Sequence, residues 1–372
     1  MNYLVEIGLI FITSFILGMA IYPVFIRLYT KKRIFDKRDS RKIHLQDVPT
    51  MGGVPMFIAF LVTIFIWSSF SALAENRFLI GSLIFMMFVG LRDDFINLRP
   101  TIKLLSQLVP AIVIFYFTDI RIESLYGFVS DSPFPVWLSL PVTLFTVIVI
   151  TNSFNLIDGL DGLAGTISLI VLTVLGAWFT LIEDYIFSLV LFAMAGGLFA
   201  FLQFNWQPAK IFMGDTGALI LGFIISVAII RFINLNYELP ADSAFKFKGT
   251  IATALAVLFI PLFDTLRVFI LRLIKRKSPF QADKNHVHHI LFRVGMTHKQ
   301  AVLFLAGVNL IFVTLVVILR NVSDNLLVPI ILVTGLFLAL LLDYLFIKKV
   351  LIEQKQDSRS IMEIIRSSKN AS

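Results

Sequence analysis

The chain has 372 residues, of which 58% are hydrophobic and 15% are charged, and its mean hydropathy is +0.89. Soluble domains contain about 45–50% apolar and about 25% charged residues, so this composition excludes a soluble globular protein and predicts an all-α polytopic membrane protein. The absence of Cys excludes disulfides, thiolate nucleophiles and Cys-based zinc sites. The net charge is +8. In a membrane protein, excess basic residues usually lie in the cytoplasmic connections, so this charge does not indicate a nucleic-acid partner.

Eleven apolar segments alternate with charged or turn-rich connections. The first segment has no basic residue before it and is followed by Lys31, Lys32 and Arg33, which predicts an outer N-terminus. With alternating crossings from that start, 26 of the 32 Lys and Arg residues lie on the inner side and six on the outer side. The predicted segments are residues 4–27, 51–70, 78–91, 102–118, 136–151, 163–182, 185–204, 216–234, 249–270, 300–319 and 327–347.

The sequence predicts one integral membrane domain over residues 1–347 and a polar cytoplasmic tail over residues 348–372. No connection is long enough to form a separate globular domain. We therefore expect any functional site to be built from the inner connections, at the cytoplasmic face of the membrane.

The first two inner connections carry more polar groups than topology requires. They contain, in chain order, Lys42, His44, Thr50, Gly52, Gly53, Asp93, Asp94 and Lys103. The adjacent carboxylates of Asp93 and Asp94 repel each other and need a cation or a proton to coexist. Carboxylate and amide oxygens are the ligands that magnesium prefers, usually few in number and completed by substrate phosphates. Taken alone, this pair could also be solvated acids or a helix cap.

The third inner connection carries polar residues at intervals of three, namely Asn152, Asn155, Asp158 and Asp161. If this stretch is helical, these side chains form a slowly turning polar stripe that faces one way. Helix capping explains one or two of them, but not four in register. The stripe therefore predicts a second group of ligands for the same site.

The last two inner connections add amide, basic, acidic and imidazole groups, at Asn205, Lys210, Asp215, Asp283, His286, His288 and His289. Three imidazoles so close together can form a zinc site with Asp283, or can offer hydrogen bonds or positive charge to phosphate oxygens. The basic residues nearby favour the phosphate role. Asp264 and Arg267 form either an interfacial ion pair or a support for the site, and the sequence does not decide between them.

These residues carry a resemblance to the polyprenyl-phosphate N-acetylhexosamine-1-phosphate transferase superfamily, glycosyltransferase family 4. Within it the chain resembles the bacterial undecaprenyl-phosphate N-acetylglucosaminyl-1-phosphate transferases. The resemblance covers about residues 40 to 300. It rests on Asp93-Asp94, the run Asn152–Ala164, the run Pro208–Gly217 and His286–His289. Each motif is weak or moderate by itself, but their order and spacing between membrane segments are specific.

The resemblance implies transfer of a sugar 1-phosphate from a UDP-N-acetylhexosamine to undecaprenyl phosphate, giving undecaprenyl-diphosphate-sugar and UMP. It implies a multi-pass protein of the bacterial inner membrane with a cytoplasmic active site, and a homodimer is an open expectation. Mg²⁺ is the implied cofactor, with Mn²⁺ as an alternative. Asp215 is its firmest ligand; Asn155 is the preferred second ligand, with Asp161 as its rival.

The remaining roles are also implied by the resemblance. Asp93 or Asp94 would engage or deprotonate the lipid phosphate, which Lys103 would hold, and the imidazoles would bind diphosphate or sugar. The expected catalytic residues are Asp93, Asp94, Asp158, Asp161, His286, His288 and His289. The expected substrate-binding residues are Lys42, His44, Thr50, Gly52, Gly53, Lys103, Asn152, Asn205 and Lys210.

Three alternatives stay open at this point. The nearest is the phospho-N-acetylmuramoyl-pentapeptide transferase of peptidoglycan synthesis, from which the wording of the His286–His289 and Ala209–Gly217 motifs departs. A secondary transporter is a different class, but transport sites usually lie near the middle of the bilayer. A non-enzymatic scaffold for glycan assembly would not need the acidic residues.

Overall fold

The computed structural model describes residues 3–35, 48–276 and 286–369, with side chains as far as Leu351. These residues form helices and no β-strand; Phe35 and Pro49 make an isolated antiparallel bridge. The helices are α1 (Tyr3–Lys32), α2 (Gly53–Trp67), α3 (Phe70–Glu75), α4 (Arg77–Ile96), α5 (Pro100–Phe117), α6 (Val136–Ile157), α7 (Leu163–Leu181), α8 (Tyr185–Asn205), α9 (Gly214–Glu238), α10 (Thr250–Val257), α11 (Phe259–Ile274), α12 (Val287–Val294), α13 (His298–Ile318) and α14 (Asp324–Lys369).

Within the described ranges, eight helices are long and apolar enough to cross a membrane. A ninth crossing results if α10 and α11, which are bent by 82° at their junction, form one broken span. The all-α polytopic architecture is thus confirmed, whereas the expected number of eleven crossings is not. Each of the eleven predicted segments contains helix, but α2 has only 15 residues and the last turn of α4 carries two adjacent aspartates.

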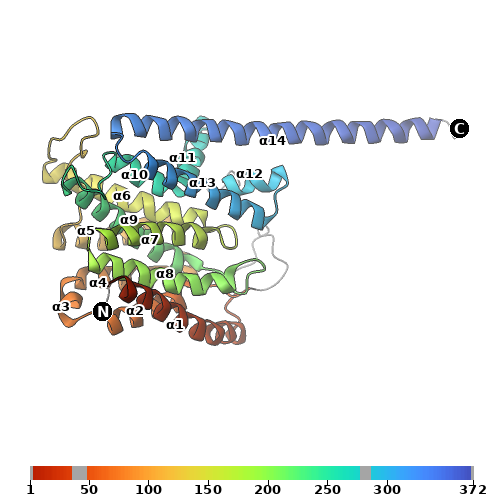
Figure 1. Cartoon of the computed structure of the whole chain (residues 1–372). Helices are drawn as coiled ribbons and strands as arrows, with labels where there is room; N and C mark the ends of the chain where they lie inside the picture. Colours follow the sequence, from red (N-terminus) through yellow and green to blue (C-terminus); the bar gives the residue numbers. More distant parts are fainter. Residues whose placement is uncertain (1–2, 36–47, 277–285, 370–372) are drawn as a thin grey trace.

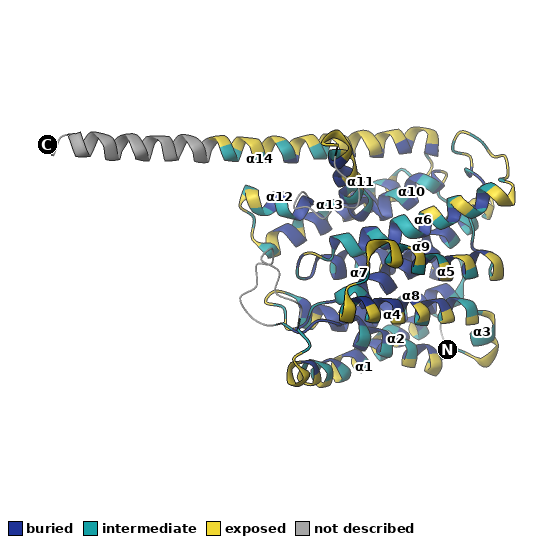
Figure 2. Ribbon diagram, turned by 180° about the vertical axis from the view of Figure 1, so that it is seen from behind, coloured by how far each residue is buried: buried dark blue, intermediate teal, exposed yellow. Residues whose placement is uncertain are grey.

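The helices lie side by side, with α9 inside the bundle and α1 and α14 at its rim (Figures 1 and 2). In α9, 83% of the most apolar stretch is buried, against 22% in α1 and 28% in α14. A helix that is apolar all round is stable inside a membrane bundle as well as against lipid, so burial follows from packing partners rather than from hydrophobicity. α14 runs beyond the other helices as a single rod and includes most of the predicted tail.

Glycines allow two helices to approach the first turn of α9. A Cβ on Gly53 of α2 would lie 2.1 Å from the nitrogen of Gly217, and a Cβ on Gly90 of α4 would lie 2.3 Å from the Cα of Thr216. Only a residue without a side chain fits at either point, as is common where membrane helices cross closely. The contact at Gly90 brings the end of α4, with Asp93 and Asp94, against the start of α9.

A tight connection between α4 and α5 folds Lys103 back toward Asp93. Asn97 ends α4 in a left-handed conformation with φ of +54°, and Pro100 occupies the first turn of α5, where its missing N–H is not needed. The N–H of Leu98 donates to the Asp93 carboxylate at 2.7 Å and fixes the turn. Lys103 therefore lies in the first turn of α5, at the same end of the bundle as the α9 N-terminus.

Candidate active site

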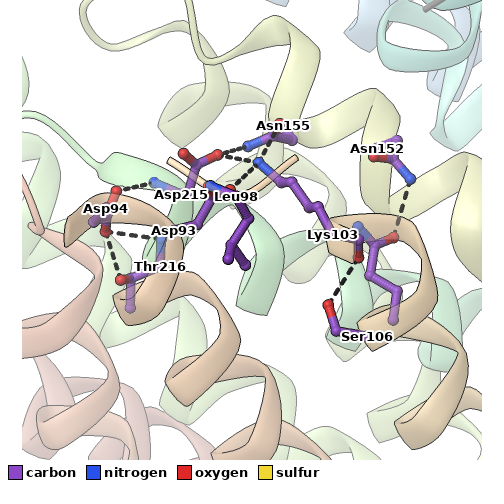
Figure 3. Close-up of polar contacts among 10 residues, drawn as sticks. Asp93, Asp94, Leu98, Lys103, Ser106, Asn152, Asn155, Asp215 and Thr216 are labelled. Atoms are coloured by element: carbon purple, nitrogen blue, oxygen red, sulfur yellow. Dashed lines mark hydrogen bonds and ion pairs between the residues drawn. The ribbon is translucent and has the colours of Figure 1, made fainter. Parts of the chain in front are cut away.

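The start of α9 is held by the carboxylate of Asp94, from the last turn of α4 (Figure 3). One oxygen accepts from the N–H of Asp215 at 2.7 Å, and the other accepts from the N–H and the hydroxyl of Thr216 at 3.1 and 2.6 Å. Gly214 has φ of +74°, and a Cβ there would lie 2.8 Å from both Asp94 oxygens. A carboxylate at a helix N-terminus satisfies free N–H groups and is stabilised by the helix dipole. Asp94 thus fixes the backbone that carries Asp215.

The ammonium group of Lys103 lies among side chains from three other helices (Figure 3). It pairs with Asp93 Oδ2 of α4 at 2.8 Å and with Asp215 Oδ1 of α9, and it donates to Asn155 Oδ1 of α6 at 3.1 Å. Asn155 Nδ2 in turn donates to Asp215 Oδ1 at 2.6 Å. The structure therefore joins four of the predicted residues, from three connections of the chain, in one network that we call the Lys103 network.

The predicted polar stripe is helical only in its first half. Asn152 and Asn155 lie on α6, Asp158 caps its C-terminus, and Asp161 lies in the turn before α7. Asn152 lies one turn before Asn155, and its amide donates to the Gln107 side chain of α5 at 3.0 Å. Asn152 thus braces α5 against α6 beside the Lys103 network, while Asp158 and Asp161 belong to the α6–α7 turn.

Asn205, one of the expected substrate-binding residues, joins two loops of the chain. Its Oδ1 accepts from the N–H of Gly162 at 2.8 Å, and its Nδ2 donates to the carbonyl of Ile211 at 2.8 Å. The side chain is buried and both ends of the amide are used within the protein. Lys210, in the second of these loops, is exposed.

Residues 50–53, which include the expected substrate-binding residues Thr50, Gly52 and Gly53, are also buried in the protein. The N–H groups of Gly52 and Gly53 donate to carbonyls just before α9 at 2.8 and 2.9 Å. The hydroxyl of Thr50 lies 3.0 Å from the position of a Cβ on Gly214. These three residues are buried and hold the loop before α9 in place. The predicted residues that lie outside the described ranges are Lys42, His44 and Asp283.

The histidine cluster lies against the α6–α7 turn. A Cβ on Gly159 would lie 3.0 Å from His288 Nε2, so the absence of a side chain there lets α12 approach the turn. The rings of His286 and His288 are nearly parallel with centroids 5.8 Å apart, and those of His288 and His289 are 4.3 Å apart. The turn that carries Asp158 and Asp161 thus connects the Lys103 network, at Asn155, with the histidines.

Burial lowers the pKa of His288 to about 3, against the opposing effect of the Asp264 carboxylate. A neutral imidazole has one N–H donor and one acceptor. At physiological pH, His288 can therefore offer a hydrogen bond to a phosphate oxygen but no positive charge. Of the two ways in which an imidazole can bind phosphate, by hydrogen bonding or by positive charge, only hydrogen bonding is open to His288.

The oxygen atoms of the Lys103 network suit a divalent cation. Asp215 and Asn155 already direct oxygens at one cationic group, and the single ammonium of Lys103 faces the carboxylates of both Asp93 and Asp215. Among the described residues, no three His, Cys, Asp or Glu side chains are grouped to hold a metal ion on their own. Magnesium typically takes few protein ligands and adds substrate phosphates, so the expected ligands fit it.

Similarity to known proteins agrees with this arrangement. The sequence pattern described as glycosyl transferase family 4 matches residues 77–233, which include every member of the Lys103 network. A Bacillus subtilis protein named "Probable undecaprenyl-phosphate N-acetylglucosaminyl 1-phosphate transferase" is 31% identical over 322 residues, 86% of this chain and 87% of that protein. The chain belongs to glycosyl transferase family 4. The resemblance read from the sequence motifs is therefore confirmed.

Two further relatives of this member of glycosyl transferase family 4 carry different names and match different shares of the chain. The undecaprenyl-phosphate alpha-N-acetylglucosaminyl 1-phosphate transferase of Escherichia coli K12 is 29% identical over 303 residues, 77% of each chain. The phospho-N-acetylmuramoyl-pentapeptide-transferase of Streptococcus gordonii is 35% identical over 242 residues, 59% of this chain and 72% of that protein. Likeness to the first kind of relative thus extends over more of the chain.

Three residues at the site had no role, or no definite role, in the sequence interpretation. Gln107 and Thr216 contact predicted site residues, and Asp264 contacts the histidine cluster. Thr216 lies inside the Pro208–Gly217 motif, and Asp264 is an acidic residue near the inner end of a predicted membrane segment. Gln107 gave only a weak signal, as a buried amide in an apolar helix, because polar side chains inside membrane helices usually have partners.

Proposed function

We propose that this protein transfers N-acetylglucosamine 1-phosphate, or a related N-acetylhexosamine 1-phosphate, from a UDP-sugar to undecaprenyl phosphate. The reaction forms a bond between a lipid phosphate oxygen and the sugar-bearing phosphorus, and it breaks the bond from that phosphorus to UMP. The observation that carries the proposal is the Lys103 network, which gathers a cation, two carboxylates and an amide within the matched family region. The names of the relatives that match most of the chain support the same reaction.

Each residue of the Lys103 network has a role that follows from its chemical group. Lys103 binds the lipid phosphate through its ammonium group, and Asp93, paired with it at 2.8 Å, orients that group and takes a proton from the phosphate when one is present. Asp215 and Asn155 would hold a divalent metal ion, whose charge would neutralise the donor diphosphate and the departing UMP. Asp94 is already committed to three donors of α9, so we assign it to positioning Asp215.

The α6–α7 turn and α12 form the donor side of the site. Asp158 and Asp161 are half-buried in the turn, beside Gly159, and His288 lies against that glycine. Hydrogen bonds from imidazoles, together with the metal, suit the oxygens of a diphosphate. We propose that this side binds the UDP-sugar, and that Asp161 contacts the sugar or nucleotide rather than the metal.

The reaction is tested with the full chain purified in detergent. With radiolabelled UDP-N-acetylglucosamine, undecaprenyl phosphate and Mg²⁺, we expect a labelled lipid and equimolar UMP; excess chelator should abolish both, and Mn²⁺ should restore them. A panel of UDP-sugars then identifies the preferred donor. Product from UDP-N-acetylmuramoyl-pentapeptide alone would favour the peptidoglycan enzyme, and solute movement in liposomes without UMP release would favour a transporter.

We further propose that residues 1–347 form the catalytic membrane domain of a bacterial inner-membrane protein, with the site and the tail 348–372 in the cytoplasm. The excess of Lys and Arg in the connections on the site side supports this orientation. Because the chain has no Cys, single cysteines can report it directly. In intact cells, a membrane-impermeant maleimide should label Ser132→Cys and spare Lys299→Cys, both at exposed positions. The reverse pattern would contradict the orientation.

A further inference from the structure

Asp264 of α11 is a buried carboxylate with two hydrogen-bond partners on another element. Its Oδ2 lies 2.7 Å from His286 Nδ1, and its Oδ1 accepts from the N–H of Val287 at 2.7 Å. Only 2% of the residue is exposed. Arg267, the residue that the sequence offered as its ion-pair partner, instead pairs with Asp343 of α14. Asp264 therefore supports the histidine cluster.

The contact fixes the chemical form of His286. An ionised carboxylate can only accept hydrogen bonds, so Nδ1 of the ring carries the hydrogen that points at Asp264. The second ring nitrogen, Nε2, then stays available for another partner, as an acceptor in the neutral ring and as a donor in the protonated ring. Carboxylates that support functional imidazoles in this way commonly set both ring orientation and tautomer.

The second hydrogen bond fixes the helix that follows. α12 has only eight residues, and its N-cap residue, His286, makes no side-chain capping hydrogen bond. The free N–H of Val287 at the first turn is satisfied by Asp264 from α11, in place of a local cap. Because His288 of α12 lies against Gly159, the position of α12 determines how the imidazoles meet the α6–α7 turn.

We propose that Asp264 is a positioning residue for the reaction: it holds His286 in one tautomer and anchors α12, so that the histidine cluster stays in place for the donor diphosphate. This inference rests on the proposed function.

The informative substitution is Asp264→Asn. The amide oxygen of Asn can still accept from the N–H of Val287, while its NH₂ group faces Nδ1 and favours the opposite tautomer. We expect kcat to fall about 10- to 100-fold, the usual range for loss of a supporting contact. The KM for undecaprenyl phosphate should change less than about twofold, because that substrate contacts the Lys103 network.

A double-mutant cycle separates positioning from general support of the fold. If Asp264 acts through His286, Asp264→Asn should change the activity of His286→Gln by less than about twofold. The matched control is Asp324→Asn: Asp324 is equally buried and accepts from two helix N–H groups, but at the opposite end of the bundle and without a histidine. Multiplicative effects in the cycle, or an equal loss of kcat in the control, would overturn the proposal.

A spectroscopic measurement tests the contact without relying on activity. In protein labelled with [¹⁵N]histidine, with His286 assigned by its absence from His286→Gln, the shifts should report a protonated Nδ1. Asp264→Asn should reverse or mix the tautomers. A wild-type His286 with unprotonated Nδ1 at neutral pH would overturn the inference. If the wild-type protein makes no labelled lipid, the proposed function fails instead, and the spectrum still judges the contact.

Discussion

The two ends of the helix bundle use the same hydrogen bond for different purposes. At the end that holds the Lys103 network, Asp94 accepts from the first N–H groups of α9 and Asp264 from that of α12. At the opposite end, Asp324 accepts from N–H groups of α10 at 2.7 and 3.2 Å, and Asp184 from one of α8 at 3.2 Å. All four satisfy N–H groups of helix N-termini, which have no partner within the helix itself.

The ends differ in what the capped residue does. Asp94 caps a helix whose second residue is Asp215, and Asp264 also bonds His286. Asp324 bonds only backbone N–H groups of α10, and Asp184 adds a surface-side ion pair with Arg231. An aspartate that accepts from the N–H groups of a helix N-terminus is therefore a structural feature of both ends of the bundle. It serves chemistry where the group that it orients carries chemistry.

The largest effect that this comparison predicts follows from removing a group that carries chemistry. Asp215→Asn should lower kcat/KM by about 1,000-fold or more, because a metal contributes several kcal/mol to the transition state and each 1.36 kcal/mol is tenfold. Binding of Mn²⁺, followed by electron paramagnetic resonance, should weaken in parallel. Asp184→Asn is the matched change at the opposite end and should leave both quantities within about twofold. Intact activity in Asp215→Asn would remove this residue from the metal site.

Lys103→Met should have the next largest effect. It removes the ammonium group that pairs with both Asp93 and Asp215, so the carboxylates repel each other and the lipid phosphate loses its partner. We expect kcat/KM for undecaprenyl phosphate to fall about 100-fold, since a hydrogen bond to a charged group is worth about 1.5–3 kcal/mol and each 1.36 kcal/mol is tenfold. Steady-state kinetics with varied lipid measure this. Lys248→Met, at an exposed position of the opposite end, should behave as wild type.

Asp94→Asn and Thr216→Val should have intermediate effects. The first loses acceptor capacity for the three donors of α9, and the second removes only the hydroxyl bonded at 2.6 Å. We expect activity to fall about tenfold and about threefold, since a net hydrogen bond is worth about 0.5–1.5 kcal/mol and one to a charged group more. Weaker Mn²⁺ binding should accompany both losses. Unchanged metal binding with lost activity would make Asp94 a direct participant in the reaction.

Asp324→Asn should change stability and leave catalysis intact. It loses one acceptor for the N–H groups of Ile251 and Ala252, which should lower stability by about 1–3 kcal/mol. Thermal unfolding in detergent measures the loss, and kcat/KM per folded molecule should stay within about twofold of wild type. A large catalytic defect with normal unfolding would show that the two ends are coupled, which this comparison does not predict.

The smallest expected effect is a pH dependence of stability at the site end. The pKa of His288 is lowered to about 3 in the folded chain, whereas an exposed histidine titrates near 6.5. Between these values the unfolded chain binds the extra proton, so stability falls as the pH drops below about 6.5. His288→Gln removes this contribution. Between pH 8 and pH 5 the unfolding temperature of the variant should therefore drop less than that of wild type; an equal drop would contradict the buried neutral ring.

The sequence by itself determined the class of fold and named candidate residues for the site. Apolar segments and the distribution of Lys and Arg predicted an all-α membrane protein, because a bilayer imposes length and hydropathy on each crossing. The sequence did not determine the number of crossings, because α2 has only 15 residues and the α10–α11 junction bends by 82°. The motifs also named Asp93, Lys103, Asn155 and Asp215 as members of one site before their distances were known.

Only the tertiary structure decided which partner each polar group takes. Lys103 pairs with Asp215, 112 positions later in the chain. Asp264 forms its side-chain hydrogen bond with His286, whereas the sequence offered Arg267 as its partner. The internal contacts of Asn205 and Gly53, two residues expected to bind substrate, could also not be read from the sequence. Such pairings depend on which helices pack together and at what distance. Hydropathy does not encode that information, because lipid-facing and protein-facing surfaces in a membrane are equally apolar.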